Sequence, residues 1–441
     1  MVMEMTAKTI VLGAGMSGLG AALLSNLPVY EATNRPGGVC HSYYIDEGGT
    51  KLDPGSGDVS KCFRFEPAGG HWLFGTSQTS LQLLMQYSSF TRYIRRAAVF
   101  FPPDGGFVPY PLQDHLSYLD PAVRDQILAE FCSERQGIER TSGSFRDLLL
   151  TRFGPTLCKL FFFPFNERYT SGIYSTIIPQ DLYKSAIDRS RLLRGAFKDA
   201  GSTGYNTIFY YPTEGLDQLV RGISGGCTIH YDHRVVHIDT SRREVHFGNG
   251  LVINYGGIIS TIPLNSMMEL CGIECRQPPD PATAVLVVNI GAVKGVKCPP
   301  YHWVYLPLSQ SGMHRVGFYS QVDRSFLPYR YRHRDELVSL YAEKSYPGDA
   351  RPSPEAMATA CTAIVEELMD WGFIEKVLVV DSTYTDPAYT WSRVGSSWAE
   401  EAMTELAQHE IYQIGRYGRW HFQGMMESLE QGLSAAAGRS P

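Results

Sequence analysis

Apolar residues near the start of the chain form a short run that ends in glycines. Residues 9–12 (TIVL) have the length and composition of a strand, and residues 17–27 continue as a helix rich in small residues. Residues 28–30 then form a second short strand that leads to Glu31. This order of strand, glycine turn, helix and strand predicts the first βαβ unit of a doubly wound parallel sheet.

The middle of the chain carries the capping signals of helices. Asp120 stands before Pro121 as an N-cap followed by proline at the first helical position. Ser144 and Asp147 form the pattern of a capping box. We therefore predict that residues 80–204 are mainly a helical insertion.

After Tyr205 the pattern becomes that of strands again. Short runs rich in β-branched and aromatic residues predict an antiparallel substrate sheet together with the closing strands of the first domain. The spacing then indicates two helices, at residues 335–346 and 354–371, and a final strand at 411–414. The predicted strands are residues 209–211, 235–238, 245–247, 257–260, 285–291, 303–306 and 315–319, with a hairpin at 100–111.

Three glycines follow the first strand in the order G-x-G-x-x-G, at Gly13, Gly15 and Gly18. The first permits a tight turn, the second lets a pyrophosphate approach the backbone, and the third lets helix and strand pack closely. Glu31 follows about 20 residues after Gly13, the spacing at which a carboxylate accepts hydrogen bonds from ribose hydroxyls. These features predict a dinucleotide site.

Composition narrows the class of protein. Hydrophobic residues make up 44% of the 441 residues and charged residues 19%, as in a globular enzyme of two or three subdomains. The formal charge of -6 gives no basic field for nucleic acid or an anionic membrane, so local arginines must hold any anionic substrate. The nine cysteines lack metal-ligand spacing, and we expect no metal, reduced thiols and a cytoplasmic protein.

Two further segments favour FAD as the dinucleotide. Residues 35–38 (RPGG) resemble the second glycine pair of the flavoenzyme superfamily that includes amine oxidases, protoporphyrinogen oxidase and UDP-galactopyranose mutase. Residues 415–418 (GRYG) follow the final strand, where the same superfamily closes over its flavin. The predicted FAD-binding residues are Gly13, Gly15, Gly18, Glu31, Arg35, Gly37, Gly38, Val236, Gly415 and Arg416.

Four segments resemble the UDP-galactopyranose mutase family in particular, and their order and approximate spacing cover most of the chain. They are GGHWLF at 69–74, VPYPLQ at 108–113, WVYLP at 303–307 leading to His314 and Arg315, and GRYGRW at 415–420.

This resemblance implies an interconversion between the pyranose and furanose forms of a nucleotide-diphosphate sugar, with no net redox change. In that family the flavin must be reduced, so an external reductant such as NAD(P)H is implied. The flavin N5 attacks the anomeric carbon, displaces the nucleotide diphosphate, and forms a flavin–sugar adduct that lets the sugar open and close again.

On this basis we predict an α/β fold, with a Rossmann-like FAD-binding domain, a helical insertion and an antiparallel substrate sheet. The predicted segments are a first part of the FAD-binding domain at 1–79, the mainly helical insertion at 80–204, a second part of the FAD-binding domain at 205–265, the substrate-binding sheet and helices at 266–400, and the closing part of the FAD-binding domain at 401–441.

The resemblance also implies roles for single residues. His71 resembles the family's histidine near the flavin N5, and Arg315 resembles the family's arginine after the W-x-Y-x-P strand. A diphosphate leaving group requires positive charge, which two arginines can supply through charge-assisted hydrogen bonds. Arg189 and Arg191 in DRSRLLRG stay open alternatives for the second arginine. Tyr389, in a predicted loop, resembles the tyrosine that reaches the diphosphate.

Two positions depart from the family pattern. Phe422 stands where the family usually has a tyrosine that helps to hold the diphosphate, and phenylalanine cannot donate that hydrogen bond. Thr170 stands near the position of a family tryptophan, in the segment 166–171 (NERYTS). Both changes bear on substrate binding and leave the sugar and the base open. A deoxyhexose is one hypothesis.

Two other functions fit the glycine motifs. An amine-oxidase-like flavin oxidase would take a hydride from its substrate and pass electrons to oxygen, but an apolar amine site requires neither Arg315 nor the segment 108–113. A flavin-binding protein without catalysis is the remaining alternative, and His71 beside two glycines argues against it.

Overall fold

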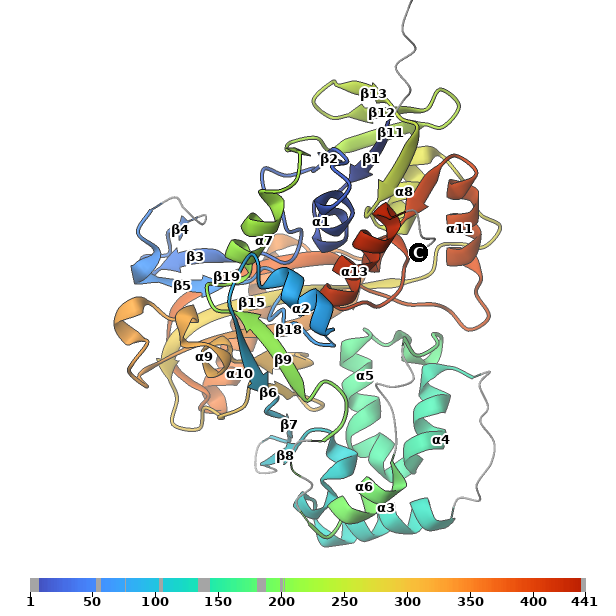
Figure 1. The fold of residues 1–441 in the computed structure, drawn as a ribbon. Helices are drawn as coiled ribbons and strands as arrows, with labels where there is room; N and C mark the ends of the chain where they lie inside the picture. The colour runs from blue at the N-terminus through green and yellow to red at the C-terminus, as the bar shows by residue number, and fades with distance from the viewer. Residues whose placement is uncertain are drawn as a thin grey trace, which may run out of the picture.

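The described residues form two large sheets, three small sheets and a helical insertion that extends away from the large sheets, towards the bottom of Figure 1. A parallel sheet lies beside a larger, mostly antiparallel sheet. The predicted α/β fold is therefore confirmed. The computed structural model describes residues 8–52, 57–75, 77–102, 106–133, 143–180, 188–198, 201 and 203–437.

The parallel sheet has the strand order β10-β2-β1-β14-β20, so four distant parts of the sequence meet in it. Its central strand β1 (Thr9–Leu12) leads through the glycine turn into α1 (Met16–Leu23), which packs against α13 (Met425–Ala436). The predicted βαβ unit is confirmed. The other strands are β2 (Val29–Tyr30), β10 (Ile229–His230), β14 (Gly257–Ser260) and β20 (Ile411–Gln413).

The larger sheet has the order β19-β15-β18-β17-β16-β7-β8. Its long strand β15 (Ala282–Lys294) pairs antiparallel with β18 (Leu337–Pro347) and with β19 (Ile374–Thr390). The predicted hairpin at 100–111 forms the far edge, although its turn at 103–105 lies outside the described residues. The other strands are β7 (Ala97–Phe100), β8 (Phe107–Pro109), β16 (Trp303–Tyr305) and β17 (Arg315–Gly317).

Two local predictions in this sheet are wrong. Residues 335–346 were expected to form a helix, but Leu337–Pro347 is the strand β18, and its first seven residues are all buried. A strand covered on both faces does not alternate between apolar and polar residues, so its apolar spacing can match a helix. Tyr389 was expected in a loop but lies in β19. That strand is at the sheet edge, where Pro387 is tolerated without a backbone N–H.

Two helices of the insertion begin where their capping residues predict. Asp120 Oδ1 accepts a hydrogen bond from Ala122 N at 2.9 Å, and Ser144 and Asp147 form the reciprocal capping box. Residues 134–142 and 181–187 of the predicted insertion lie outside the described residues. The insertion helices are α3 (Pro121–Ser133), α4 (Phe145–Leu157), α5 (Phe163–Tyr169) and α6 (Arg189–Gly195).

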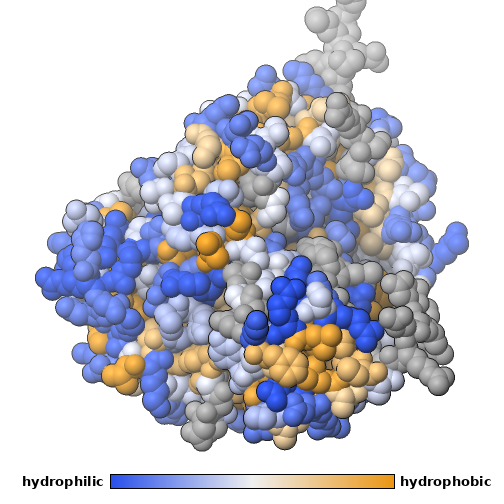
Figure 2. Space-filling view, turned by 60° about the horizontal axis from the view of Figure 1, so that its bottom comes forward, coloured by the Kyte–Doolittle hydropathy of each residue, from blue (hydrophilic) through white to orange (hydrophobic). Residues whose placement is uncertain are grey.

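The stretch Phe145–Tyr169 is long and apolar enough to cross a membrane by length and composition alone. Gly154, at φ 72° and ψ 167°, interrupts its helical backbone, and Phe153 and Phe161 are buried in the insertion's own core. We therefore interpret it as a core element of the insertion. Figure 2 shows hydrophobic residues among hydrophilic ones on the face turned forward from the bottom of Figure 1. Phe197, just after α6, is an exposed hydrophobic residue of the insertion.

Smaller elements complete the fold. The further strands are β3 (Tyr43–Asp46), β4 (Lys51–Leu52), β5 (Cys62–Phe65), β6 (Phe90–Ile94), β9 (Ile208–Pro212), β11 (Val235–Asp239), β12 (Glu244–Phe247) and β13 (Val252–Asn254). The further helices are α2 (Gln78–Leu84), α7 (Leu216–Ser224), α8 (Leu264–Cys271), α9 (Tyr319–Val322), α10 (Pro354–Asp370), α11 (Trp398–Ala407) and α12 (Gly415–Gly418). The exact domain boundaries stay a prediction.

Candidate active site

The turn after β1 has the geometry that a dinucleotide requires. Gly13 has a φ of 95°, in the region that favours glycine, and a side chain at Gly18 would overlap the carbonyl oxygen of Gly13. A side chain at Gly15 would instead meet nothing within 4 Å, so open space faces the backbone there. That space can receive a diphosphate, whereas Gly13 and Gly18 are needed for the turn and the packing.

The N-terminus of α1 faces this turn. Its N-cap is Gly15, which has no side chain to accept a hydrogen bond, so the first N–H groups of the helix stay available to an anion. Glu31 lies next to them at the end of β2 and accepts hydrogen bonds from Ala14 N at 2.7 Å and Thr33 N at 2.9 Å. A carboxylate can accept further bonds from ribose hydroxyls. These residues therefore fit a dinucleotide.

The second glycine pair lies against the first. Gly37 N donates to Ala14 O at 2.8 Å, and Gly37 and Gly38 have φ values of 105° and 58°. Arg35 lines a small recess beside this turn. Val236 lies in β11, where the pairing with β12 shifts in register between Val235 and His237, so Val236 has no regular partner in β12.

The C-terminal glycine segment closes over α1. Gly415 has a φ of 78°, and a side chain there would overlap Ser17 Oγ on α1. Arg416 Nη2 donates to Ala388 O at 2.8 Å, while its buried Nε has no partner among the described residues. The fold thus brings most of the predicted cofactor residues to the first turn of α1, and Arg416 keeps a donor for a ligand.

A cavity of about 230 Å³ lies between the insertion and the larger sheet. One wall is apolar and consists mainly of phenylalanines from α4, α5 and the π-helical turn between them (Cys158–Phe162), whereas the other wall carries tyrosines, amides and arginines. Among the described residues that line it, no carboxylate is present. The lining residues are Phe74, Arg95, Tyr110, Phe145, Leu149, Phe161, Phe162, Phe165, Asn166, Tyr169, Pro179, Gln180, Tyr205, Asn206, Trp303, Tyr305, His314, Arg315, Tyr389, Trp391 and Phe422.

Arg315 reaches this cavity from β17 and is held from behind by a buried carboxylate. Its Nε and Nη2 donate to Glu343 at 2.8 Å and 2.6 Å, and His314 Nε2 lies 3.1 Å from the same carboxylate. Burial opposes ionisation of Glu343, but the positive charge of Arg315 and the bond with His314 outweigh it and lower its pKa to about 2. Glu343 is therefore a charged partner that fixes the Arg315 guanidinium.

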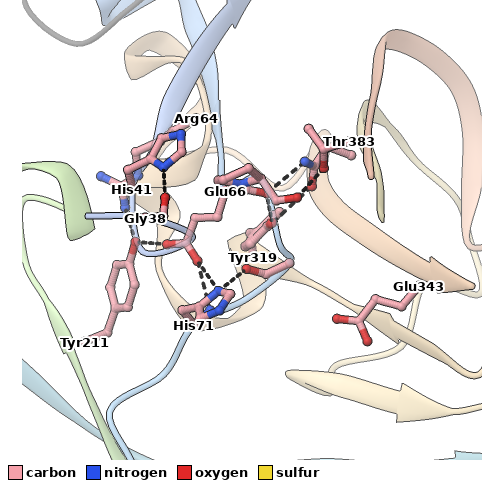
Figure 3. A network of polar contacts seen from close by, with 12 residues as sticks. Gly38, His41, Arg64, Glu66, His71, Tyr211, Tyr319, Glu343 and Thr383 are labelled. Atoms are coloured by element: carbon pink, nitrogen blue, oxygen red, sulfur yellow. Dashed lines mark hydrogen bonds and ion pairs between the residues drawn. The ribbon is translucent and has the colours of Figure 1, made fainter. Parts of the chain in front are cut away.

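His71 follows the glycine turn at Gly69, and Figure 3 shows its contacts. Its Nδ1 lies 2.9 Å from Gly69 O, and because a carbonyl only accepts, Nδ1 must carry the proton. Burial lowers the pKa of His71, which favours the neutral imidazole with a lone pair on Nε2. The side chain remains 22% exposed, so a ligand can reach it.

Aromatic rings connect the cofactor segment to the cavity. The Arg416 guanidinium carbon lies 5.0 Å from the ring centre of Tyr389 and 4.5 Å from that of Phe422, and both rings line the cavity. The Tyr389 ring also lies 4.8 Å from that of Tyr169. Burial raises the pKa of Tyr389, so its hydroxyl remains a hydrogen-bond donor at neutral pH. Arg416 therefore carries positive charge between the predicted flavin site and the cavity.

The structure brings neither alternative for the second arginine to the cavity lining. Arg189 donates to Phe131 O at 3.2 Å, and Arg191 Nε lies 3.2 Å from Asp188, the N-cap of its own helix α6. Arg95 lines the cavity instead and donates to the backbone carbonyls of Tyr110, Thr203 and Tyr205. No carboxylate pairs with it among the described residues.

Other residues of the site were missed in the sequence. Tyr110 and Tyr305 lie within the quoted segments 108–113 and 303–307, so those motifs could have identified them. Arg95 and Glu343 have no local motif, because they meet the site only through strand pairing and tertiary contacts. Thr170 is buried and bonds to Asn166 O, so it does not take the place of a cavity-lining tryptophan.

Comparison with known proteins bears on the family and the fold. Residues 16–437 match the family of flavin containing amine oxidoreductases. No curated protein sequence matches the chain at a significant level. At these identities the following structural likenesses concern the fold alone. The solved structures include a reduced UDP-galactopyranose mutase (TM-score 0.81, 21% identity, 98% of this chain and 93% of that chain), a putative protoporphyrinogen oxidase from Exiguobacterium sp. 255-15 (TM-score 0.71, 13% identity, 98% of each chain) and a putrescine oxidase bound to putrescine (TM-score 0.57, 15% identity, 98% of each chain).

Proposed function

The chain belongs to the family of flavin-containing amine oxidoreductases, and from this premise we propose that it is an FAD-dependent mutase that interconverts the pyranose and furanose forms of a nucleotide-diphosphate sugar. The observation that carries this proposal is the charge of the cavity. It presents two arginines and, among the described residues, no carboxylate. Such a lining suits an anionic substrate and opposes a cationic amine.

The chain's own residues divide the work between cofactor and substrate. The first turn of α1, Glu31 and Arg416 hold the dinucleotide, which when bound in its reduced form supplies the nucleophile. Arg315 and Arg95 stabilise the diphosphate of the sugar nucleotide, and the neutral Tyr389 hydroxyl donates to it. The phenylalanine wall excludes water from the reacting carbon and gives the base an apolar surface.

An amine-oxidase-like reaction remains the second candidate, because the family match and the putrescine oxidase fold favour it. The aromatic rings around Arg416 also resemble the surroundings that many cation sites have. In this chain, however, the Arg416 guanidinium already occupies the space between those rings, and its positive charge would repel an ammonium substrate.

One pair of incubations separates the two reactions. Protein loaded with FAD and reduced anaerobically with dithionite is mixed with a panel of UDP- and dTDP-linked hexopyranoses, and anion-exchange chromatography detects furanose products. The same protein, oxidised and in air, is mixed with putrescine and assayed for peroxide. We expect a furanose from at least one sugar nucleotide, only with reduced protein. Peroxide without any furanose would overturn the mutase proposal. NAD(P)H replaces dithionite in a third incubation that tests the proposed reductant.

A further inference from the structure

A buried carboxyl group is hydrogen-bonded to the backbone of His71. Glu66 follows β5, and its side chain is completely buried. Its Oε1 lies 2.6 Å from the Tyr211 hydroxyl oxygen, and its Oε2 accepts a hydrogen bond from the backbone N–H of His71 at 2.9 Å (Figure 3). Oε2 also lies 4.0 Å from His71 Nδ1. The Glu66 carboxyl is therefore bonded to the backbone of His71 and lies close to its imidazole ring.

Two buried carboxyl groups thus flank the turn that carries His71, and their surroundings differ. Glu343 approaches from β18, where a side chain at Gly69 would lie 2.6 Å from its Oε1, and it is paired with Arg315. The groups bonded to the Glu66 carboxyl are a phenol and an amide, both neutral. Burial raises the pKa of Glu66 to about 8, against the opposite effect of the Tyr211 hydrogen bond. Near neutral pH one carboxyl is charged and the other holds a proton.

The chemistry of the two partners fixes where the Glu66 proton lies. A backbone N–H can only donate, so Oε2 must be the acceptor for His71. The proton of the neutral acid therefore belongs to Oε1, in the short contact with the Tyr211 oxygen. Arg64 Nη2 lies 3.5 Å from the Tyr211 hydroxyl oxygen, and the positive charge of Arg64 favours that oxygen as the acceptor of the Glu66 proton. Loss of this proton leaves a negative charge on the carboxyl.

We propose that Glu66 is a positioning residue for His71 whose ionisation switches the charge that the His71 imidazole faces. With Glu66 neutral, the His71 imidazole stays neutral, and Glu66 holds the backbone N–H of His71 in place. With Glu66 ionised, a negative charge 4.0 Å from Nδ1 favours a second proton on Nε2 and opposes negative charge on a neighbouring flavin. The inference rests on the proposed flavin site but not on the identity of the substrate.

Other titratable groups face Glu66 from several elements, and each contributes to the field in which it ionises. The positive charge of Arg64 favours the Glu66 carboxylate, whereas the negative charge of the buried Asp217 opposes it. The groups that interact with Glu66 electrostatically are Cys40 before β3, Arg64 on β5, Tyr211 on β9, Asp217 on α7, Tyr319 on α9 and Tyr341 on β18.

The ionisation can be followed without flavin. Protein labelled with ¹³C at histidine Cε1 is titrated by NMR, and the His71 signal is assigned by its loss in His71→Asn. We expect the His71 signal of the unaltered chain to shift in one step near the Glu66 pKa of about 8. Glu66→Gln keeps the shape and the acceptor but removes the charge, so this step disappears. Tyr211→Phe removes a bond that stabilises the carboxylate, so the step moves to higher pH.

Asp280→Asn is the matched control. Asp280 is also buried, burial also raises its pKa, and it also accepts a hydrogen bond from a backbone amide, that of Arg393 at 3.1 Å. Its replacement leaves the His71 step unchanged. A step that persists in Glu66→Gln, or one that stays in place or moves to lower pH in Tyr211→Phe, would overturn the proposal. If Glu66→Gln does not fold, Tyr211→Phe decides alone.

A second readout uses the flavin-loaded protein. Its midpoint potential is measured against pH by spectroelectrochemistry, and the negative charge of ionised Glu66 is expected to lower the potential in a step above pH of about 8. Glu66→Gln lacks that step. Neither the NMR titration nor the potential involves a sugar nucleotide. Failure of the mutase proposal therefore appears separately, as absence of furanose with both pH steps intact.

Discussion

Arg315 and Glu343 are direct cross-strand partners in β17 and β18, and their side chains form a two-pronged ion pair with N–O distances of 2.6 Å and 2.8 Å. The register of the sheet therefore determines where the guanidinium lies. The pair uses two of the five N–H donors of the arginine and leaves the others for a ligand. A rigid sheet rather than a loop thus presents this charge to the cavity.

Removing the carboxylate from this pair should destabilise the fold. Glu343→Gln leaves the Arg315 charge without its buried partner, and loss of one member of a buried pair typically costs about 3–5 kcal/mol. Urea denaturation at pH 7 measures the change in the free energy of unfolding. Glu366→Gln, at an exposed position of α10, serves as the control and should change it by less than about 0.5 kcal/mol. Equal effects of both changes would show that the pair contributes nothing specific.

The same pair predicts how stability depends on acid. The pKa of Glu343 lies near 2 in the folded protein, below its ordinary value of 4.5, so its stabilising contribution is present above pH 4.5 and is lost as the pH falls towards 2. The unaltered chain should therefore lose more stability than Glu343→Gln over this interval. The free energy of unfolding of both proteins is measured by urea denaturation at about six pH values between pH 5 and pH 2. Parallel curves would contradict the lowered pKa.

The planar arrangement of N–H donors in the Arg315 guanidinium should matter for catalysis, in addition to its charge. Arg315→Lys keeps a positive charge near Glu343 but cannot bond in two prongs, so a diphosphate loses geometric stabilisation. We expect kcat/KM to fall by about 10²–10³ with the fold retained. Furanose formation from the best sugar nucleotide of the panel measures the change. Arg242→Lys, at an exposed turn, is the control.

The parts of this fold that depend on local chemistry were predictable from sequence. Gly13 needs a positive φ and Gly18 needs the absence of a side chain, so both requirements appear as glycines. The capping residue Asp120 likewise accepts its own helix's N–H groups. In contrast, the strand at 337–347 is buried on both faces, and its apolar run contains no alternation that would separate it from a helix.

The site was less predictable because its residues meet through tertiary structure. Arg189 and Arg191 matched an expected arginine only by type, and the structure shows why such a match is weak: Asp188 caps α6 and pairs with Arg191 locally. Arg95 belongs to the cavity because strand β6 pairs with β9, far along the chain, and brings it to the carbonyls of the segment before β9. No spacing in the sequence records that contact.

The geometry of the glycine turn predicts different outcomes for a glycine-to-alanine substitution at Gly15 and at Gly18. Gly15→Ala places a methyl group in open space, so the protein should fold with nearly unchanged stability but bind flavin weakly, because the methyl occupies the diphosphate position. Gly18→Ala places a methyl group against Gly13 O and should destabilise the fold itself. Flavin content after reconstitution and urea denaturation of the apoprotein separate the two effects. Normal flavin content in Gly15→Ala would contradict the assignment of that space.

Phe422 offers a test in the direction of gained function. Its ring lines the cavity and lies 4.5 Å from the Arg416 guanidinium, where the mutase family usually has a tyrosine. Phe422→Tyr adds one hydroxyl to this wall, and a hydrogen bond to a charged diphosphate is worth about 1.5 kcal/mol, or roughly tenfold in affinity. We expect tighter binding of UDP by isothermal titration calorimetry. Phe197→Tyr, whose hydroxyl would point from an exposed position, controls for the added group and should leave the affinity unchanged. Weaker binding in Phe422→Tyr would mean that the cavity wall is shaped for a substrate whose diphosphate lies elsewhere.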